Sequence, residues 1–256
     1  MDTSKFFPSK IIQVFALFLL SLLLVFPFFI IFKIDKITTS ELLKSLWFTL
    51  VNSVFIMLTW VINFKRKQKL ELHFKINRFQ CLFLMLFAIL FFQLGINIPL
   101  NHVFENLWSD TPKTIHSEDI YIALGAITIG PFFEEVIFRG IILRGLLTRY
   151  SARISILLSS LMFGLFHFKP EQIWGAILLG LFFGYIYLKT KSVGTVILLH
   201  SFANLCILIF KNYQVKILTN SFSYAFLFTL IMGSSIAILL IVRRLVAFLK
   251  IETSNK

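Results

Sequence analysis

Apolar residues in this 256-residue chain come in long runs that short polar segments separate. A helix needs about 20 apolar residues to cross the hydrocarbon core of a bilayer. Two acids and an arginine interrupt the fourth run, and the fifth and sixth runs are short. The predicted spans are Ile11–Phe32, Ser45–Phe64, Phe79–Leu100, a span from Ile120 onward, Ile154–Phe168, Ile173–Leu188, Val193–Phe210 and Phe222–Val242. We therefore expect an all-α, polytopic membrane protein of about eight transmembrane helices around a polar intramembrane cavity.

Composition excludes several other classes of protein. Hydrophobic residues make up 58% of the chain and charged residues 14%, whereas soluble domains have about 45–50% and about 25%. A soluble enzyme, a disordered tail and a secreted disulfide-rich domain are thereby excluded. The two cysteines, Cys81 and Cys206, both lie in apolar runs, so we expect neither a disulfide framework nor a CxxC motif. No repeat or linker divides the chain, which predicts a single membrane domain over residues 1–256.

The net charge of +13 orients the protein in the bilayer instead of indicating nucleic acid as a partner. With the N-terminus inside, 17 of the 25 basic residues fall in cytoplasmic segments and 7 outside. The positive-inside rule then predicts a multi-pass protein of the plasma membrane with both termini in the cytoplasm. The most basic loop, Lys65–Arg78, is expected to be solvated, and lying on anionic headgroups is the alternative.

Ionisable residues inside membrane spans are costly, and they mark functional sites by default. The deep polar residues are Glu134, Glu135, Arg139, His167, His200 and Asn204. Residues four apart share a helix face, so Glu135 can pair with Arg139, and His200 and Asn204 can face one point. Counted along straight helices from the nearest cytoplasmic basic residue, the polar groups of three spans lie about 14–21 Å deep. This agreement in depth predicts one shared cavity.

Hydrolysis of a peptide bond without a covalent intermediate is one reaction that such a cavity supports. A carboxylate and an imidazole can activate a water, while a second imidazole and an amide stabilise an oxyanion. Glu134 is the better base because Glu135 pairs with Arg139. A zinc site of two histidines and one glutamate is the alternative, although the HExxH spacing is absent, and we expect no cofactor. Purely structural roles for the ion pair and for the His200–Asn204 pair also stay open.

The three motifs resemble those of the CAAX-protease and bacteriocin-processing (CPBP, or Abi) family. Two glutamates with arginine four residues later match Glu134, Glu135 and Arg139, and an aromatic residue with histidine four later matches Phe163 and His167. The third motif, histidine with asparagine four later, matches His200 and Asn204. The resemblance covers residues 120–210, and the order of the motifs also matches.

This resemblance implies an intramembrane endopeptidase that acts on a membrane-associated or prenylated protein or peptide. It implies that Glu134 is the base, that His167 orients the water, and that His200 and Asn204 form the oxyanion hole. Glu135 and Arg139 would then be supporting residues. The alternatives are a non-catalytic membrane partner of the immunity or scaffold type, and a zinc-dependent form of the same protease. A transporter is less favoured because no repeat is visible. The expected partners are the peptide substrate and the lipid bilayer.

Overall fold

The computed structural model describes residues 6–34, 41–75, 79–101, 120–167, 170–221 and 224–254. All regular elements in these ranges are helices, which confirms the all-α fold class. The elements are α1 (Ile11–Ile34), α2 (Glu41–Lys65), α3 (Phe79–Phe92), η2 (Gln93–Asn97), α5 (Ile120–Ile127), α6 (Ile129–Glu135), η3 (Val136–Leu143), α7 (Arg144–Leu146), α8 (Ala152–Leu165), α9 (Pro170–Thr190), α10 (Val193–Ser221) and α11 (Tyr224–Ser254). The elements η2 and η3 are π-helical.

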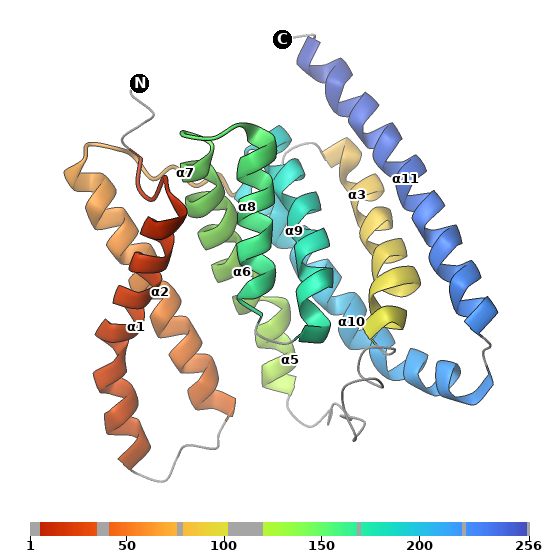
Figure 1. Cartoon of the computed structure of the whole chain (residues 1–256), viewed down its shortest axis with the longest axis horizontal. Coiled ribbons are helices and arrows are strands. Elements are labelled where there is room, and N and C mark those ends of the chain that lie inside the picture. Colours follow the sequence, from red (N-terminus) through yellow and green to blue (C-terminus); the bar gives the residue numbers. More distant parts are fainter. Residues whose placement is uncertain are drawn as a thin grey trace.

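Within the described ranges these elements form eight helical passes, because residues 79–101 make one continuous helix and residues 120–146 one interrupted helix (Figure 1). Five helices are long and apolar enough to span a bilayer: Leu46–Lys65, Cys81–Asn101, Gln172–Thr190, Val193–Phe210 and Phe228–Ala247. The apolar stretches Ile11–Pro27 and Ala152–Leu165 are shorter. The polytopic membrane fold is thus confirmed. The predicted span ends Phe168 and Phe222, and six residues of the charge count, lie outside the described residues: Lys5, Lys36, Arg78, Lys113, Lys169 and Lys256.

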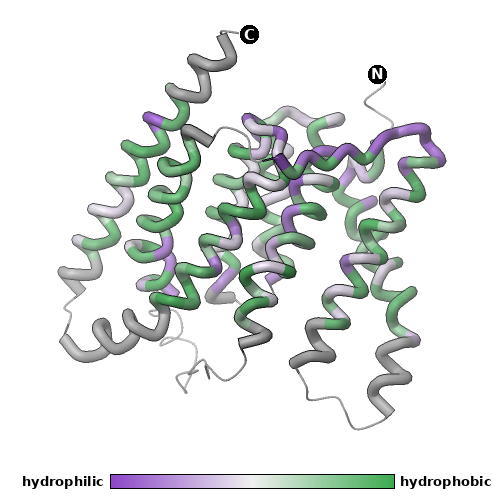
Figure 2. Tube along the Cα trace, turned by 180° about the vertical axis from the view of Figure 1, so that it is seen from behind, coloured by the Kyte–Doolittle hydropathy of each residue, from purple (hydrophilic) through white to green (hydrophobic). Residues whose placement is uncertain are grey.

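The passes pack mainly in pairs, with α1 against α2, α8 against α9 and α3 against α11. The α10 helix runs between these pairs and contacts α3, α5, α6 and α9. Glycines allow the close approach of α8 and α9: a side chain at Gly180 would meet Ser160, and one at Gly184 would meet Ile156. Small residues at a helix interface permit such a close approach. Many large apolar side chains of the described residues are exposed, and hydrophobic residues predominate along the helices (Figure 2).

Residues 66–75, which we call the strap, cross one end of the bundle in an extended course between α2 and α3 (Figures 1 and 2). The guanidinium group of Arg144 donates hydrogen bonds to the carbonyl oxygens of Lys69 (3.2 Å) and Glu71 (2.7 Å). The carbonyl oxygen of His73 accepts from the first amide of α10, at Val193 (2.8 Å). The strap backbone is therefore fixed to the bundle, because α7 and α10 supply donors that its carbonyls accept.

The side chains of the strap divide between solvent and the bundle. Leu70 and Leu72 pack on the hydrophobic core, whereas the basic side chains of the strap are exposed. Partial burial lowers the pKa of the neighbouring Lys191, and the charge of Arg144 lowers it further. The strap thus joins the ends of several passes and gathers positive charge at that end of the molecule.

Substituting Gly194 by alanine should destabilise the protein, because the new methyl group would meet the backbone carbonyl of Phe74 in the strap. Backbone atoms cannot rotate away, so we expect a loss of about 1–3 kcal/mol, the usual cost of overpacking. Thermal unfolding of the detergent-solubilised protein measures this. The matched control is Gly233→Ala, where no atom lies within 4 Å of the added group. Equal midpoints for the two variants would contradict the packed strap.

Candidate active site

The helix that carries the two glutamates is interrupted twice. Thr128 separates α5 from α6, and Pro131 lies in the first turn of α6, where a missing backbone N–H is tolerated. The eight residues that follow Glu135 form the π-helix η3, and all of them are buried. Such π-helical turns are rare and are frequent at functional sites. The helix is thus interrupted at Thr128, three residues before Pro131.

Glu135 is the centre of a buried polar cluster. Its Oε1 atom accepts from Arg139 NH1 at 2.8 Å and lies 2.7 Å from Nδ1 of His200. The exposed fractions are 0% for Glu135, 1% for Arg139 and 4% for His200. The predicted pair between Glu135 and Arg139 is therefore confirmed, and His200 of α10 joins it.

Aromatic rings and one carbonyl surround the guanidinium group of Arg139. The group lies 4.5 Å from the ring centre of Phe163 and 5.5 Å from that of Phe183. Its NH2 atom also donates to the carbonyl oxygen of Gly180 at 3.3 Å. A buried cation is tolerated when it is paired and hydrogen-bonded, and aromatic faces add cation–π attraction. Arg139 thus joins α8 and α9 to the glutamate helix.

Glu134 points to the opposite side of this cluster and is partly accessible. Its side chain is 25% exposed, and its Oε2 atom lies 3.8 Å from Nε2 of His200. That distance is too long for a direct hydrogen bond, and Oε2 has no hydrogen-bond partner among the described residues. His200 therefore lies between the two carboxylates, with Nδ1 bonded to Glu135 and Nε2 turned toward Glu134.

The hydrogen bond of His167 fixes which of its ring nitrogens carries the proton. Nδ1 lies 2.9 Å from the carbonyl oxygen of Phe163, and a carbonyl oxygen can only accept. Nδ1 is therefore the donor, which leaves Nε2 of the neutral ring as an acceptor. His167 is thus suited to accept a proton or to orient a water.

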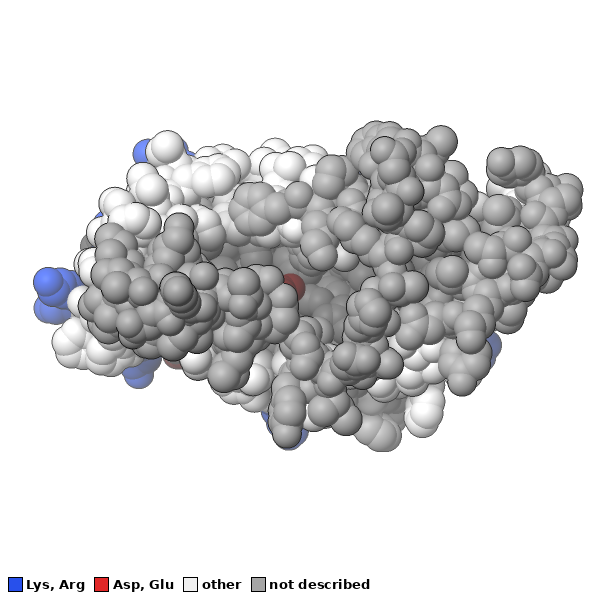
Figure 3. All heavy atoms as spheres, turned by 90° about the horizontal axis from the view of Figure 1, so that it is seen from below, with Lys and Arg blue, Asp and Glu red and all other residues white. Residues whose placement is uncertain are grey.

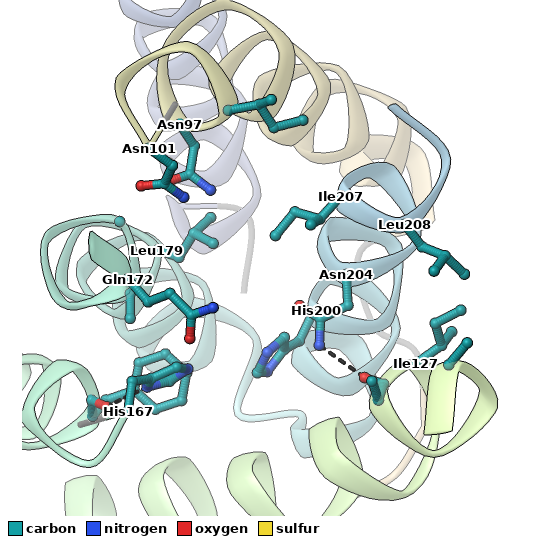
Figure 4. Close-up of a pocket in the computed structure, with 16 residues that line it drawn as sticks. Asn97, Asn101, Ile127, His167, Gln172, Leu179, His200, Asn204, Ile207 and Leu208 are labelled. Carbon is teal, nitrogen blue, oxygen red and sulfur yellow. Dashed lines mark hydrogen bonds between the residues drawn. The ribbon is translucent and has the colours of Figure 1, made fainter. Parts of the chain in front are cut away.

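A cavity of about 330 Å³ adjoins these groups (Figure 4). It is lined by residues of five helical passes: Asn97, Ile98, Asn101, Ala123, Ala126, Ile127, Phe163, His167, Gln172, Gly175, Ala176, Leu179, His200, Asn204, Ile207 and Leu208. The predicted residues His167, His200 and Asn204 thus meet in one pocket, as their depths suggest. Asn204 also donates from Nδ2 to the carbonyl oxygen of Ala126 at 2.8 Å. Glu134 and Glu135 are joined to this pocket through His200.

Sequence reasoning missed a row of amides on the opposite wall of the pocket (Figure 4). Gln93 donates to the carbonyl oxygen of Ala203 (3.2 Å), and Asn97 donates to Oε1 of Gln93 (2.6 Å). Trp174 donates to Oδ1 of Asn101 (3.0 Å). These amides stand four residues apart in an otherwise apolar run, and this spacing is the signal that could have revealed them.

Because each amide in this chain of hydrogen bonds must point one way, one acceptor oxygen is left without a donor. The carbonyl of Ala203 can only accept, so Gln93 must present its NH2 group there and its oxygen to Asn97. Asn97 must then use its NH2 group, and its Oδ1 is buried without a partner among the described residues. Gly175 of α9 lies against that oxygen, where a larger residue would not fit. This glycine thus packs against the pocket wall.

Two further observations bear on cofactors and on cysteine chemistry. Within the described ranges no group of three or more histidine, cysteine, aspartate or glutamate side chains is arranged to hold a metal ion. Cys81 and Cys206 are both buried thiols, as their place in apolar runs predicts.

Comparison with known protein families agrees with the motifs. Residues 116–206 match the family model described as type II CAAX prenyl endopeptidase Rce1-like. Searches of curated proteins and of solved structures gave no match. The matched segment contains all six of the predicted site residues and both broken parts of the glutamate helix. The match of this segment to the family model agrees with the resemblance that the three motifs indicate.

Proposed function

We propose that this protein is an intramembrane endopeptidase that hydrolyses a peptide bond of a membrane-associated protein or peptide by means of an activated water. One observation carries the proposal: Glu134 has an unpartnered carboxylate oxygen 3.8 Å from His200, beside a pocket inside the bundle. The match of segment 116–206 to the model of a protease family supports it. This spacing suits a base, Glu134, and a polar group, His200, that both contact one water molecule.

In this proposal Glu134 takes the proton of the attacking water. The distance of 3.8 Å between Glu134 Oε2 and His200 Nε2 suits two groups that share one water. The water oxygen bonds to the scissile carbonyl carbon, the carbonyl becomes an oxyanion, and the proton then passes from Glu134 to the leaving amine as the C–N bond breaks. The free acceptor Nε2 of His167 orients the water from the pocket side.

His200 and Asn204 stabilise the oxyanion in the same proposal. His200 can donate from Nε2 only when both ring nitrogens carry protons, and Glu135 accepts the proton on Nδ1. The carboxylates on both sides would balance the charge of that doubly protonated ring, and Arg139 fixes the position of Glu135. We therefore assign Glu135 and Arg139 as positioning residues that act through His200. Asn204 supplies its second amide hydrogen to the oxyanion.

The reaction as proposed needs no metal or other cofactor, because a carboxylate and an imidazole activate the water. The pocket lining combines small and aliphatic residues with the amides of Asn97, Asn101 and Gln172. Such a lining suits a peptide main chain, whose groups pair with amides, between uncharged side chains. An uncharged peptide segment close to the membrane is one substrate that fits this description.

Comparison of released peptides tests the proposed activity. Membranes that contain the wild-type protein should yield cleavage products that are missing with His200→Ala, because that change removes a group facing the water. Mass spectrometry of peptides and new carboxyl termini measures this, and chelator in the buffer should leave the products unchanged. Loss of the products with chelator would instead favour the zinc-dependent alternative. Identical products from both proteins, together with full function of the variant in cells, would favour the non-catalytic membrane partner.

A further inference from the structure

The pocket lies toward one end of the bundle. Several of its lining residues stand at helix ends on that side: Asn101 at the end of the third pass, Ala123 at the start of α5, His167 after α8 and Gln172 at the start of α9. Figure 3 views the molecule from this end, and an acidic side chain is visible there. The strap crosses the opposite end (Figure 1). The site is therefore entered from the end away from the strap.

Basic residues concentrate at the strap end. Within the described ranges, 14 basic residues lie at that end and 4 at the pocket end, with Arg139 between them. Those at the strap end are Lys10, Lys65, Arg66, Lys67, Lys69, Lys75, Arg144, Arg149, Arg153, Lys189, Lys191, Arg243, Arg244 and Lys250. Those at the pocket end are Lys33, Lys44, Lys211 and Lys216. The hydrogen bonds of Arg144 to the strap make this asymmetry part of the fold.

We propose that the pocket opens on the non-cytoplasmic face of the membrane and takes an uncharged peptide segment of an exported or membrane-anchored polypeptide. The side with excess lysine and arginine is cytoplasmic under the positive-inside rule, and the pocket opens on the other side. The peptide part of this inference rests on the proposed function, whereas the sidedness does not. A lipid-modified carboxyl terminus in the cytoplasmic leaflet would not reach such an opening.

The residues that line the pocket determine which kind of peptide segment it can bind. The residues that line the pocket include amides, histidines and apolar side chains, and none of them is an acid, lysine or arginine. A charged substrate side chain would leave water for a lining of mostly uncharged groups, which is costly. The amides of the lining, in contrast, can pair with the main-chain groups of a peptide. The favoured segment is therefore an extended stretch of small or apolar residues.

Labelling of single cysteines tests the sidedness in the full chain. The variants are Gln172→Cys, at the pocket, and Lys69→Cys, on the strap; both positions are exposed. The wild type is the blank because its two cysteines are buried. A membrane-impermeant maleimide on intact cells should label Gln172→Cys, and it should label Lys69→Cys only after permeabilisation. Labelling of Lys69→Cys alone, or of both variants, in intact cells would overturn the proposal.

A fusion after Lys256 provides a second measurement that does not depend on either cysteine variant folding. A green fluorescent protein fused there should fluoresce, and an alkaline phosphatase should be inactive, because both report a cytoplasmic strap end. An active phosphatase would overturn the proposal.

Sealed vesicles of known orientation, given a neutral fluorogenic peptide and its lysine-substituted form, test the substrate class. Correct sidedness without hydrolysis would contradict only the proposed function.

Discussion

Replacing Glu134 by glutamine should lower the rate of peptide cleavage by about 10²–10⁴-fold, the usual contribution of a general base. Glutamine keeps the size and most of the hydrogen-bonding capacity of the side chain, but it cannot take a proton from water. Because the carboxylate of Glu134 makes no bond to Arg139, its removal should leave the buried cluster around Glu135 intact. The loss is therefore expected in kcat and not in the fold.

Turnover and unfolding of the same preparations check this prediction. The matched control is Glu71→Gln, a carboxylate on the exposed strap that lies 3.9 Å from Arg144 and far in sequence from the pocket. We expect wild-type turnover from that control and an unchanged unfolding midpoint for Glu134→Gln. A Glu134→Gln protein that still cleaves at the wild-type rate would show that another group activates the water.

Replacing Arg139 by leucine should destabilise the protein by about 3–5 kcal/mol, the cost of removing one partner of a buried ion pair. The carboxylate of Glu135 would stay in the bundle with only His200 as a partner, and its second oxygen already has no partner among the described residues. The contacts with Phe163, Phe183 and the carbonyl of Gly180 would also be lost. We thus expect both the glutamate helix and its packing on α9 to loosen.

Unfolding of the purified protein in detergent measures this cost. Arg149→Leu is the control, because Arg149 is an exposed arginine at the strap end, and it should unfold as the wild type does. The double variant Arg139→Leu with Glu135→Leu should recover part of the loss, since an apolar pair replaces the charges together. Equal stability of Arg139→Leu and Arg149→Leu would mean that the buried pair contributes nothing.

The pattern of apolar runs was sufficient to predict the membrane fold and the meeting of three polar motifs. Depth along straight helices places His167, His200 and Asn204 together, and the structure brings all three into one pocket. The i, i+4 rule also identifies the pair between Glu135 and Arg139. These features follow from periodicity along one helix, and a sequence displays such periodicity directly.

Sequence patterns could not predict contacts between segments that lie far apart in the chain. The bond between His200 and Glu135 depends on the rotation of α10 against η3, and no spacing within one helix encodes that rotation. The strap reads as a polar loop because its stabilising groups are its carbonyl oxygens, whose donors lie at Arg144 and Val193. The hydrogen bond between the amides of Gln93 and Asn97 was not predicted, because both residues are uncharged and lie in an apolar run.

The π-helix η3 sets the rotation about the helix axis between the site residues and Arg144, which lies further along the same pass. Each residue of an α-helix advances the chain by about 100° around the axis, as 3.6 residues per turn require. Deleting one residue between Arg139 and Arg144 would therefore leave every site residue in the chain, yet would turn Arg144 away from the carbonyls of Lys69 and Glu71. The length of this segment is thus as much a determinant of the structure as the identity of the residues on either side.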